Sequence, residues 1–306
     1  MWFRNLRVYR LQRELNLDLA GLDELLAKRP LPRCGSFEMV SRGWVFPRQE
    51  GAFVHAVNRQ WLLALGVEQK LLPATVIRQT TQERAAQIEA AESRKVGRKE
   101  LRDISDRVTE ELMPKAFTCR RTTWAWLDPL HGWLVVDAGS DARADEFMEV
   151  LLGTLDDIAP RPLQTQVSPI AAMTGWLAGG ATGAAGAAPV GFTLDSDLDL
   201  RAASEAQAAI RYVHHDIGGP EVAAHIAAGK IATKLGMTWN DRVSFVLTDK
   251  LHLKRLAFLD ILKEQAEKSA ENADEQFDTD FTLMSGELAQ LFDDLLLALG
   301  GELKPS

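Results

Sequence analysis

The feature that most constrains this fold is a long polar run, residues 78–112, that contains no proline. It reads RQTTQERAAQIEAAESRKVGRKELRDISDRVTEEL and ends just before Met113 and Pro114. Its charged residues recur at spacings of three and four, which is typical of a solvent-exposed helix. We therefore expect one helix over residues 71–112, with Pro73 near its start.

Charge is divided unevenly along the chain. The formal net charge at pH 7 is −8. Residues 1–121 nevertheless contain 22 basic and 15 acidic side chains, whereas residues 122–306 contain 13 basic and 28 acidic ones. A basic part attracts a polyanion, and an acidic remainder keeps the protein dissolved. The charge pattern thus predicts a polyanionic partner.

Three observations bear on the location of the protein. No stretch of 18 strongly apolar residues occurs, so we expect neither a transmembrane helix nor a membrane partner. The N-terminus alternates apolar and basic residues and does not form the apolar core of a signal peptide. Cys34 and Cys119 are the only cysteines, which is usual for a protein of the reducing cytoplasm. We therefore expect a cytoplasmic protein.

Strand and helix patterns alternate irregularly, without a βαβ repeat, which favours the α+β class. A Gly/Ala-rich segment, residues 175–191, is expected to be a flexible loop that leads into a second sheet. The expected organisation has three parts: a central sheet-containing part formed by residues 1–75 with 122–175, the long basic helix and a turn over residues 76–121, and a second sheet-containing part with C-terminal helices over residues 176–306.

The basic residues form several arrays that suit contacts to phosphates, which do not depend on base sequence. The main array is expected to line one side of the long helix: Arg94, Lys95, Arg98, Lys99 and Arg102. Lys230 and Lys234 lie four apart and are expected to share a helical face. Further candidate contacts are spread along the chain: Arg10, Arg13, Lys115, Lys254 and Arg255. The alternative for the main array is a solvated helix surface stabilised by Glu–Lys pairs.

No catalytic motif is recognisable, so we expect no enzyme, no cofactor and no metal. The nearest candidate for a metal site is Asp278 and Asp280, whose carboxylates lie two residues apart just before an apolar helical pattern. Asp280 at that place is more often an N-cap. Two alternative functions stay open: a metal-dependent nucleic-acid enzyme that uses these two carboxylates, and a scaffold whose acidic part docks a protein.

Several stretches resemble the RdgC family of bacterial recombination-associated proteins. They are MWFRNLRVYRL, LLPATVI, LMPKAF, HIAAGKIATKLGMTWNDRVSFVL, LKRLAF and FDTDFTLMSGELAQLFDDLLLALGGE, in this order over nearly the whole chain. The resemblance implies an α+β protein whose horseshoe-shaped subunits pair head-to-head and tail-to-tail into a ring-shaped homodimer. It also implies that the ring encircles duplex DNA without sequence preference, in the nucleoid, and binds single strands more weakly. By occupying DNA, such a protein restrains RecA-dependent recombination.

The resemblance also places two sites on this chain. The gate between subunits corresponds to residues 113–117, where Phe117 would be the apolar anchor and Lys115 its basic neighbour. A finger-like projection corresponds to residues 212–216. Relatives tend to have Lys or Gln there, whereas this chain has His214 and His215, so contacts at the finger are expected to be weaker or pH-dependent.

Overall fold

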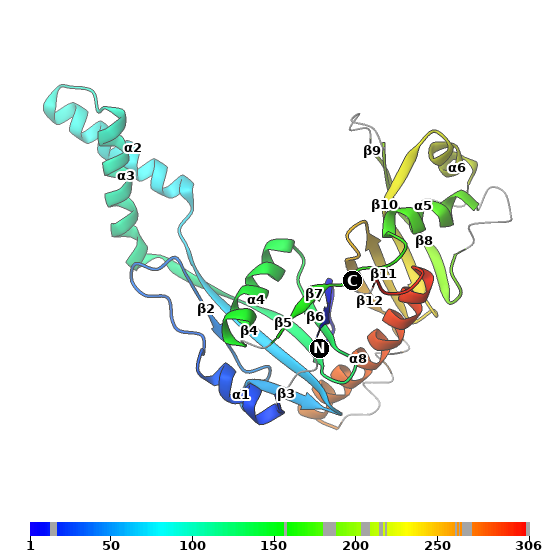
Figure 1. The fold of residues 1–306 in the computed structure, drawn as a ribbon. Helices are drawn as coiled ribbons and strands as arrows, with labels where there is room; N and C mark the ends of the chain where they lie inside the picture. Colours follow the sequence, from blue (N-terminus) through cyan, green and yellow to red (C-terminus); the bar gives the residue numbers. More distant parts are fainter. Residues whose placement is uncertain are drawn as a thin grey trace.

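The computed structural model describes residues 1–12, 17–155, 158–179, 188–202, 209–213, 217, 219–260, 262, 264 and 271–303. The described part is α+β, as the sequence predicted: seven α-helices accompany one large antiparallel sheet (Figure 1). The helices are α1 (Leu19–Ala27), α2 (Ala74–Glu92), α3 (Arg98–Leu112), α4 (Asp141–Thr154), α5 (Pro169–Gly179), α6 (Pro220–Ala227) and α8 (Ala273–Ala298), with a 3₁₀ turn, η1, over Met113–Lys115. No helix of this part is long and apolar enough to cross a membrane.

All strands of the described part belong to one twelve-stranded sheet, not to the two sheets that the sequence suggested. Ten strands follow the order β2-β4-β5-β6-β1-β12-β11-β10-β8-β9, while β3 pairs with β4 and β7 with β1. The strands are β1 (Leu6–Leu11), β2 (Val40–Trp44), β3 (Val54–Val57), β4 (Gln60–Leu71), β5 (Phe117–Asp128), β6 (Trp133–Asp137), β7 (Pro160–Pro162), β8 (Phe192–Ala202), β9 (Ala209–Tyr212), β10 (Lys230–Trp239), β11 (Val243–Thr248) and β12 (Leu253–Phe258).

The two parts of the sheet meet at a narrow joint between β1 and β12. Only Leu6 and Leu253 are paired in register there, and the Leu256 N–H extends the joint by donating to the Arg4 carbonyl at 2.8 Å. By contrast, β4 and β5 are paired over eleven positions. A sequence pattern cannot reveal a pairing between strands so far apart in the chain, which is why two sheets were expected.

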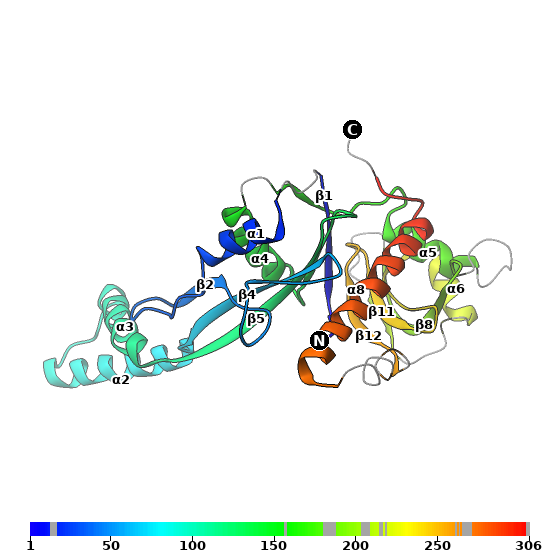
Figure 2. The ribbon, with the colours of Figure 1, turned by 90° about the horizontal axis from the view of Figure 1, so that it is seen from below.

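Helix α8 lies across this joint and packs against both parts of the sheet (Figure 2). Phe292 contacts the rings of Trp126 and Trp133 in the N-terminal part. The buried face of α8 also shares one apolar core with Leu235 and Phe245 in the C-terminal part. Each fully buried Phe or Leu of this kind contributes roughly 1.5–3 kcal/mol. Helices α1 and α4 cover the opposite face of the N-terminal part, over a second core.

The long polar run forms a helical hairpin, α2 and α3, and not the single helix that was expected. Ser93 ends α2 in the left-handed region with φ of 48°, and Gly97 caps the start of α3. The two helices enclose a small apolar core around Ala85, Ile104 and Val108. The absence of proline did not imply continuity, because Ser93 and Gly97 suffice to turn the chain. The hairpin projects at one end of the molecule, and α6 and β9 lie at the other end (Figure 1).

Three local predictions are also wrong. Lys230 and Lys234 lie on strand β10, because Gly229, with φ of 85°, ends the preceding segment and β10 pairs with β8 and β11. The C-terminal helix begins at Ala273, with Asn272 as its N-cap, so Asp280 is an interior residue and not the cap. The expected loop over 175–191 begins as the end of α5, while residues 180–187 lie outside the described part.

Candidate nucleic-acid interface

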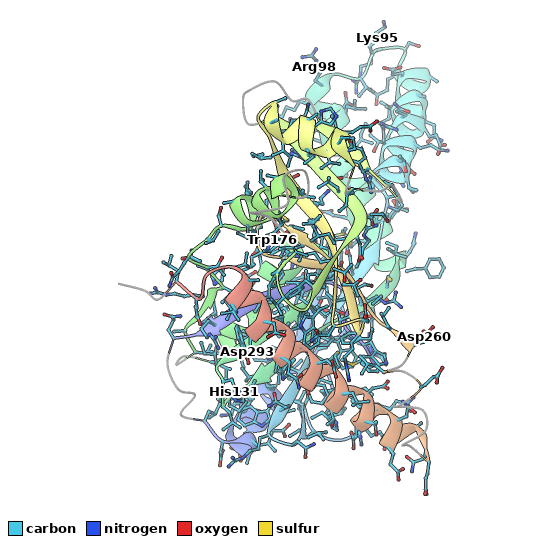
Figure 3. All side chains as sticks on the ribbon, turned by 90° about the vertical axis from the view of Figure 1, so that its right-hand side faces the viewer. Lys95, Arg98, His131, Trp176, Asp260 and Asp293 are labelled. Carbon is cyan, nitrogen blue, oxygen red and sulfur yellow. The ribbon has the colours of Figure 1, made fainter. Side chains whose placement is uncertain are left out.

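The end of the helical hairpin presents a group of exposed basic side chains. We call it the hairpin-tip cluster and define it as Lys95, Arg98, Lys99 and Arg102. None of the four forms an ion pair with another described residue. Figure 3 shows Lys95 and Arg98 extending from the end of the hairpin. Unpaired, solvated cations of this kind can neutralise phosphates without first breaking internal contacts.

The position of this cluster opposes the helix dipole. Arg98 and Lys99 occupy the first turn of α3, where the partial charge of the backbone is positive and a cation is unfavourable. Glu100 is the only acidic residue of that turn. Helix stability therefore does not explain why these cations are there. An external anion would neutralise their charge and accept hydrogen bonds from the backbone N–H groups of the first turn of α3.

Arg94 differs from the other four members of the expected array. Its guanidinium binds Glu100 at 2.6 Å and Glu92 at 2.5 Å, so it ties the end of α2 to the start of α3. The hydrogen bonds that Arg94 donates to Glu100 and Glu92 raise the pKa of its guanidinium above the usual value. Arg94 and Lys95 also precede α3, so the five residues do not share one helix face as the sequence suggested. The turn at Ser93 accounts for this difference.

The base of the hairpin is apolar and exposed. Phe117, at the start of β5, is 83% exposed, and its cross-strand partner Leu71 is 55% exposed. Phe37 is 74% exposed. The loop that contains Phe37 is held beside η1 by the Lys70 ammonium, which donates hydrogen bonds to the carbonyls of Ser36 and Met113. Exposed apolar side chains grouped in this way are typical of interaction surfaces. Phe37 and Leu71 were not among the candidates from the sequence, although an aromatic residue such as Phe37 in a polar loop is often exposed.

Lys115 lies in η1 next to this apolar surface. It is exposed, and its ammonium is 3.6 Å from the Glu111 carboxylate. A surface ion pair at this distance contributes little to stability. Lys115 is therefore free to meet a partner.

The remaining candidate contacts are placed differently from the hairpin-tip cluster. Arg10 is half-buried, binds Glu302 at 2.8 Å and lies 3.4 Å from the centre of the Trp133 ring, which is a structural role. Lys230 contacts the Nδ1 atom of His225 at 3.1 Å. Lys234 is paired with Asp199, and Arg255 with Asp197 at 2.6 Å. Lys254 forms no ion pair within the described ranges. Arg13, His214 and His215 lie outside the described residues.

The two carboxylates considered for a metal site do not converge. They stand two positions apart on α8, which separates their directions by about 200°. Asp278 binds Arg48 and lies 2.8 Å from the Nε2 atom of His55, whereas Asp280 accepts a hydrogen bond from Gln276. No group of three His, Cys, Asp or Glu side chains in the described part could hold a metal ion.

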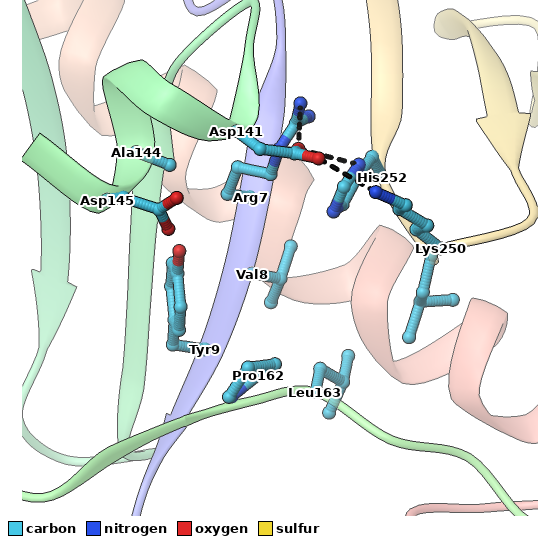
Figure 4. A pocket seen from close by; sticks show the side chains of 11 residues that line it. Arg7, Val8, Tyr9, Asp141, Ala144, Asp145, Pro162, Leu163, Lys250 and His252 are labelled. Atoms are coloured by element: carbon cyan, nitrogen blue, oxygen red, sulfur yellow. Dashed lines mark hydrogen bonds and ion pairs between the residues drawn. The ribbon is translucent and has the colours of Figure 1, made fainter. Parts of the chain in front are cut away.

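A cavity of about 330 Å³ lies beside the joint of the sheet (Figure 4). At its wall, Asp141 of α4 binds Arg7 of β1 at 3.0 Å and Lys250 at 2.8 Å, and lies 3.8 Å from the Nδ1 atom of His252. The hydrogen bond from Lys250, supported by Arg7, lowers the pKa of Asp141 to about 2. Burial, and next the charge of Arg7, lowers the pKa of His252 to about 4. These contacts connect the two parts of the sheet.

We expect acid to weaken the folded state at this joint. The unfolded His252 binds a proton near pH 6.5 and the folded one only near pH 4, so the free energy of unfolding falls as the pH drops through this range. The loss is about 2–3 kcal/mol. Asp141 adds a loss at lower pH, between its unfolded value of 3.8 and about 2. Denaturant titrations at pH 7, 5.5 and 4.5 measure the first loss.

The matched variant for this prediction is His252→Gln. In this variant the free energy of unfolding should change less with pH between pH 6.5 and 4. Burial also lowers the pKa of His55, which adds a slope of the same sign in both proteins. The difference between parent and variant therefore isolates His252. An unchanged slope in the variant would contradict the assignment.

The comparisons with known proteins agree with the resemblance seen in the sequence. A family model described as "RdgC: Putative exonuclease, RdgC" matches residues 1–302. The chain is 55% identical over 305 residues to the "Recombination-associated protein RdgC" of Dechloromonas aromatica, covering 99% of this chain and 98% of the relative. Proteins of the same name from Janthinobacterium sp. and Cupriavidus pinatubonensis are 47% and 48% identical over 304 residues, each covering 99% of this chain and 99% or 100% of the relative. Matches of this identity and coverage over the whole chain show that it belongs to the RdgC family.

Proposed function

We propose that this protein binds duplex DNA without sequence preference, encircles it as a ring-shaped homodimer, and thereby restrains RecA-dependent recombination. The observation that supports this most directly is the hairpin-tip cluster, four exposed cations on a projecting hairpin that form no ion pair with another described residue. Contacts to phosphates need charge and reach but no base-specific geometry. The printed names of the relatives connect the family with recombination.

The shape of the subunit suits a ring. In Figure 1 the helical hairpin and the α6–β9 end lie on either side of the middle of the molecule and extend upward from it, an arrangement that supports the proposed horseshoe shape. Two such subunits, related by a twofold axis, would close through two different self-complementary contacts. The apolar base of the hairpin, which includes Phe117, supplies a surface for one contact. A protein that occupies DNA in this way competes with RecA for the same strands. This competition takes place in the nucleoid and needs no cofactor.

A salt titration tests DNA binding. For a duplex, the logarithm of the affinity should fall with the logarithm of the salt concentration by about 0.9 for each phosphate neutralised, and for single strands by about 0.7. We expect a slope that corresponds to several contacts, tighter binding to duplex than to single strands, and slower dissociation from closed circles than from linear DNA. A flat salt response, or strong preference for one sequence, would contradict the proposal.

The same samples distinguish the alternatives. The description of the family model names an exonuclease, so linear duplex should also be incubated with the protein and Mg²⁺. We expect intact DNA, because Asp278 and Asp280 point in different directions and have protein partners. Progressive shortening of the DNA would establish an enzyme. The protein could still restrain RecA-dependent recombination after the hairpin-tip cluster is neutralised. That result would favour the alternative in which the acidic part of the chain docks a protein.

A further inference from the structure

A second basic site lies on the C-terminal part of the sheet, in a recess of about 230 Å³. Its cations come from three strands: Arg211 of β9, Lys234 of β10, and Lys254 and Arg255 of β12. Neighbouring residues in β10 and β12, such as Leu235 and Leu253, point the other way into the core beneath α8. The recess therefore lies on the face of the sheet that α8 does not cover.

An irregularity in β12 brings two adjacent cations into this recess. Successive residues of a strand normally point to opposite faces. Here Ser244 pairs with Ala257 and Val246 with Lys254, so Arg255 and Leu256 together oppose one residue of β11. Arg255 adopts a φ of 52°, in the left-handed region that an arginine rarely occupies. Strain at a bulge commonly re-aims a functional side chain, and here Lys254 and Arg255 both line the recess.

The charges in the recess do not balance. Two carboxylates line the recess, those of Asp197 and Asp199. Asp199 is paired with Lys234 and lies 3.6 Å from Arg211. Asp197 binds Arg255 at 2.6 Å. Lys254 has no ion pair among the described residues. Four cations thus face two carboxylates, an excess of two positive charges. The carboxylates hold the long basic side chains in place, and the excess charge matches one phosphate group.

We propose that this recess binds a single phosphate group, with Lys254 and Arg211 as its principal contacts. The phosphate can come from the backbone of bound DNA, in which case the site rests on the DNA binding proposed above, or from a free phosphate or nucleotide. Arg255 and Lys234, anchored by Asp197 and Asp199, complete the positive wall. The site is separate from the hairpin-tip cluster and lies on the opposite part of the sheet.

The test compares two charge reversals, Lys254→Glu inside the recess and Arg201→Glu outside it. Arg201 is an exposed residue of the adjoining strand β8 and gives the same change in net charge. The probes are inorganic phosphate, followed by calorimetry, and a fluorescent 20-base-pair duplex, followed by anisotropy. Lys254→Glu should lower the affinity for whichever probe the recess binds by about tenfold or more. The effect of Arg201→Glu on the same affinity should be much smaller.

A third variant, Asp197→Asn, removes a carboxylate and should tighten binding by about fivefold. A gain of this kind cannot result from misfolding. If inorganic phosphate binds the parent and is lost in Lys254→Glu while the duplex does not bind at all, the recess stands and the DNA-binding function fails. If the duplex binds the parent but both reversals weaken it equally, and phosphate does not bind, the recess proposal fails while DNA binding stands.

Discussion

Glutamine at all four positions of the hairpin-tip cluster should cause the largest loss of DNA affinity. Each contact that is removed lowers the salt slope by about 0.9, so the slope should fall by up to about 3.6 per subunit. At about 0.1 M salt this corresponds to a loss of up to three orders of magnitude in affinity. Anisotropy titrations of one duplex over a range of salt concentrations give both quantities.

The matched control removes four exposed basic residues that also lack ion pairs among the described residues but lie away from the hairpin: Lys28, Arg29, Arg59 and Arg161. It changes the net charge equally and should leave the slope almost unchanged. Folding should be intact in both proteins, because exposed polar changes usually alter stability by less than about 0.5 kcal/mol each. Equal losses in both proteins would show that the hairpin-tip cluster is only a solvated surface.

Phe117→Ala should open the ring without separating the subunits. Removing an aromatic anchor from an interface typically costs about 2–4 kcal/mol, which corresponds to a weakening of that contact by about 30-fold to 1,000-fold. The second contact of the ring remains, so analytical ultracentrifugation should still show a dimer, now with a more extended shape. Dissociation from closed circular DNA should become faster, because an open ring no longer needs a free end to leave.

Leu130→Ala is the control for this variant. Leu130 is an exposed apolar residue in the turn between β5 and β6, at the far end of β5 from Phe117. It should affect neither the shape of the dimer nor the retention of DNA. Monomers in the Phe117→Ala sample, or unchanged shape and retention, would show that Phe117 does not close the ring.

Local patterns predicted the elements whose formation depends on nearby residues. Helix α1 begins after its N-cap Asp18, and β5 and β6 form a hairpin around residues 129–132; a capping side chain and a short turn are both features of local sequence. The family resemblance likewise rests on local motifs and is confirmed. The single long helix was wrong, because a charged pattern with helical spacing continues through the turn at residues 93–97 and conceals it.

Features that depend on distant partners could not be predicted. Nothing near Arg10 in the sequence shows that Glu302 neutralises it, and nothing near Lys234 identifies Asp199 as its partner. Composition therefore ranked all basic residues alike, whereas the fold separates cations with internal partners from those of the hairpin-tip cluster. The recess depends on a bulge at Arg255, which is a property of strand register and is absent from any sequence pattern.

The central place of β1 has a consequence for synthesis. This strand leaves the ribosome before every other strand of the sheet, yet it lies between β6 and β12. Its neighbour β6 is complete once residue 137 has emerged, and β7, which pairs with Tyr9, Arg10 and Leu11, follows at residue 162. The pairing of Leu6 with β12 must wait for residue 253. During that interval the Leu6 end of β1 lacks its partner strand β12, and α8, which covers the joint, comes later still. The joint is therefore completed only after residues 253–298 have been made, and a molecular chaperone that shields the Leu6 end of β1 would protect the chain from aggregation until then.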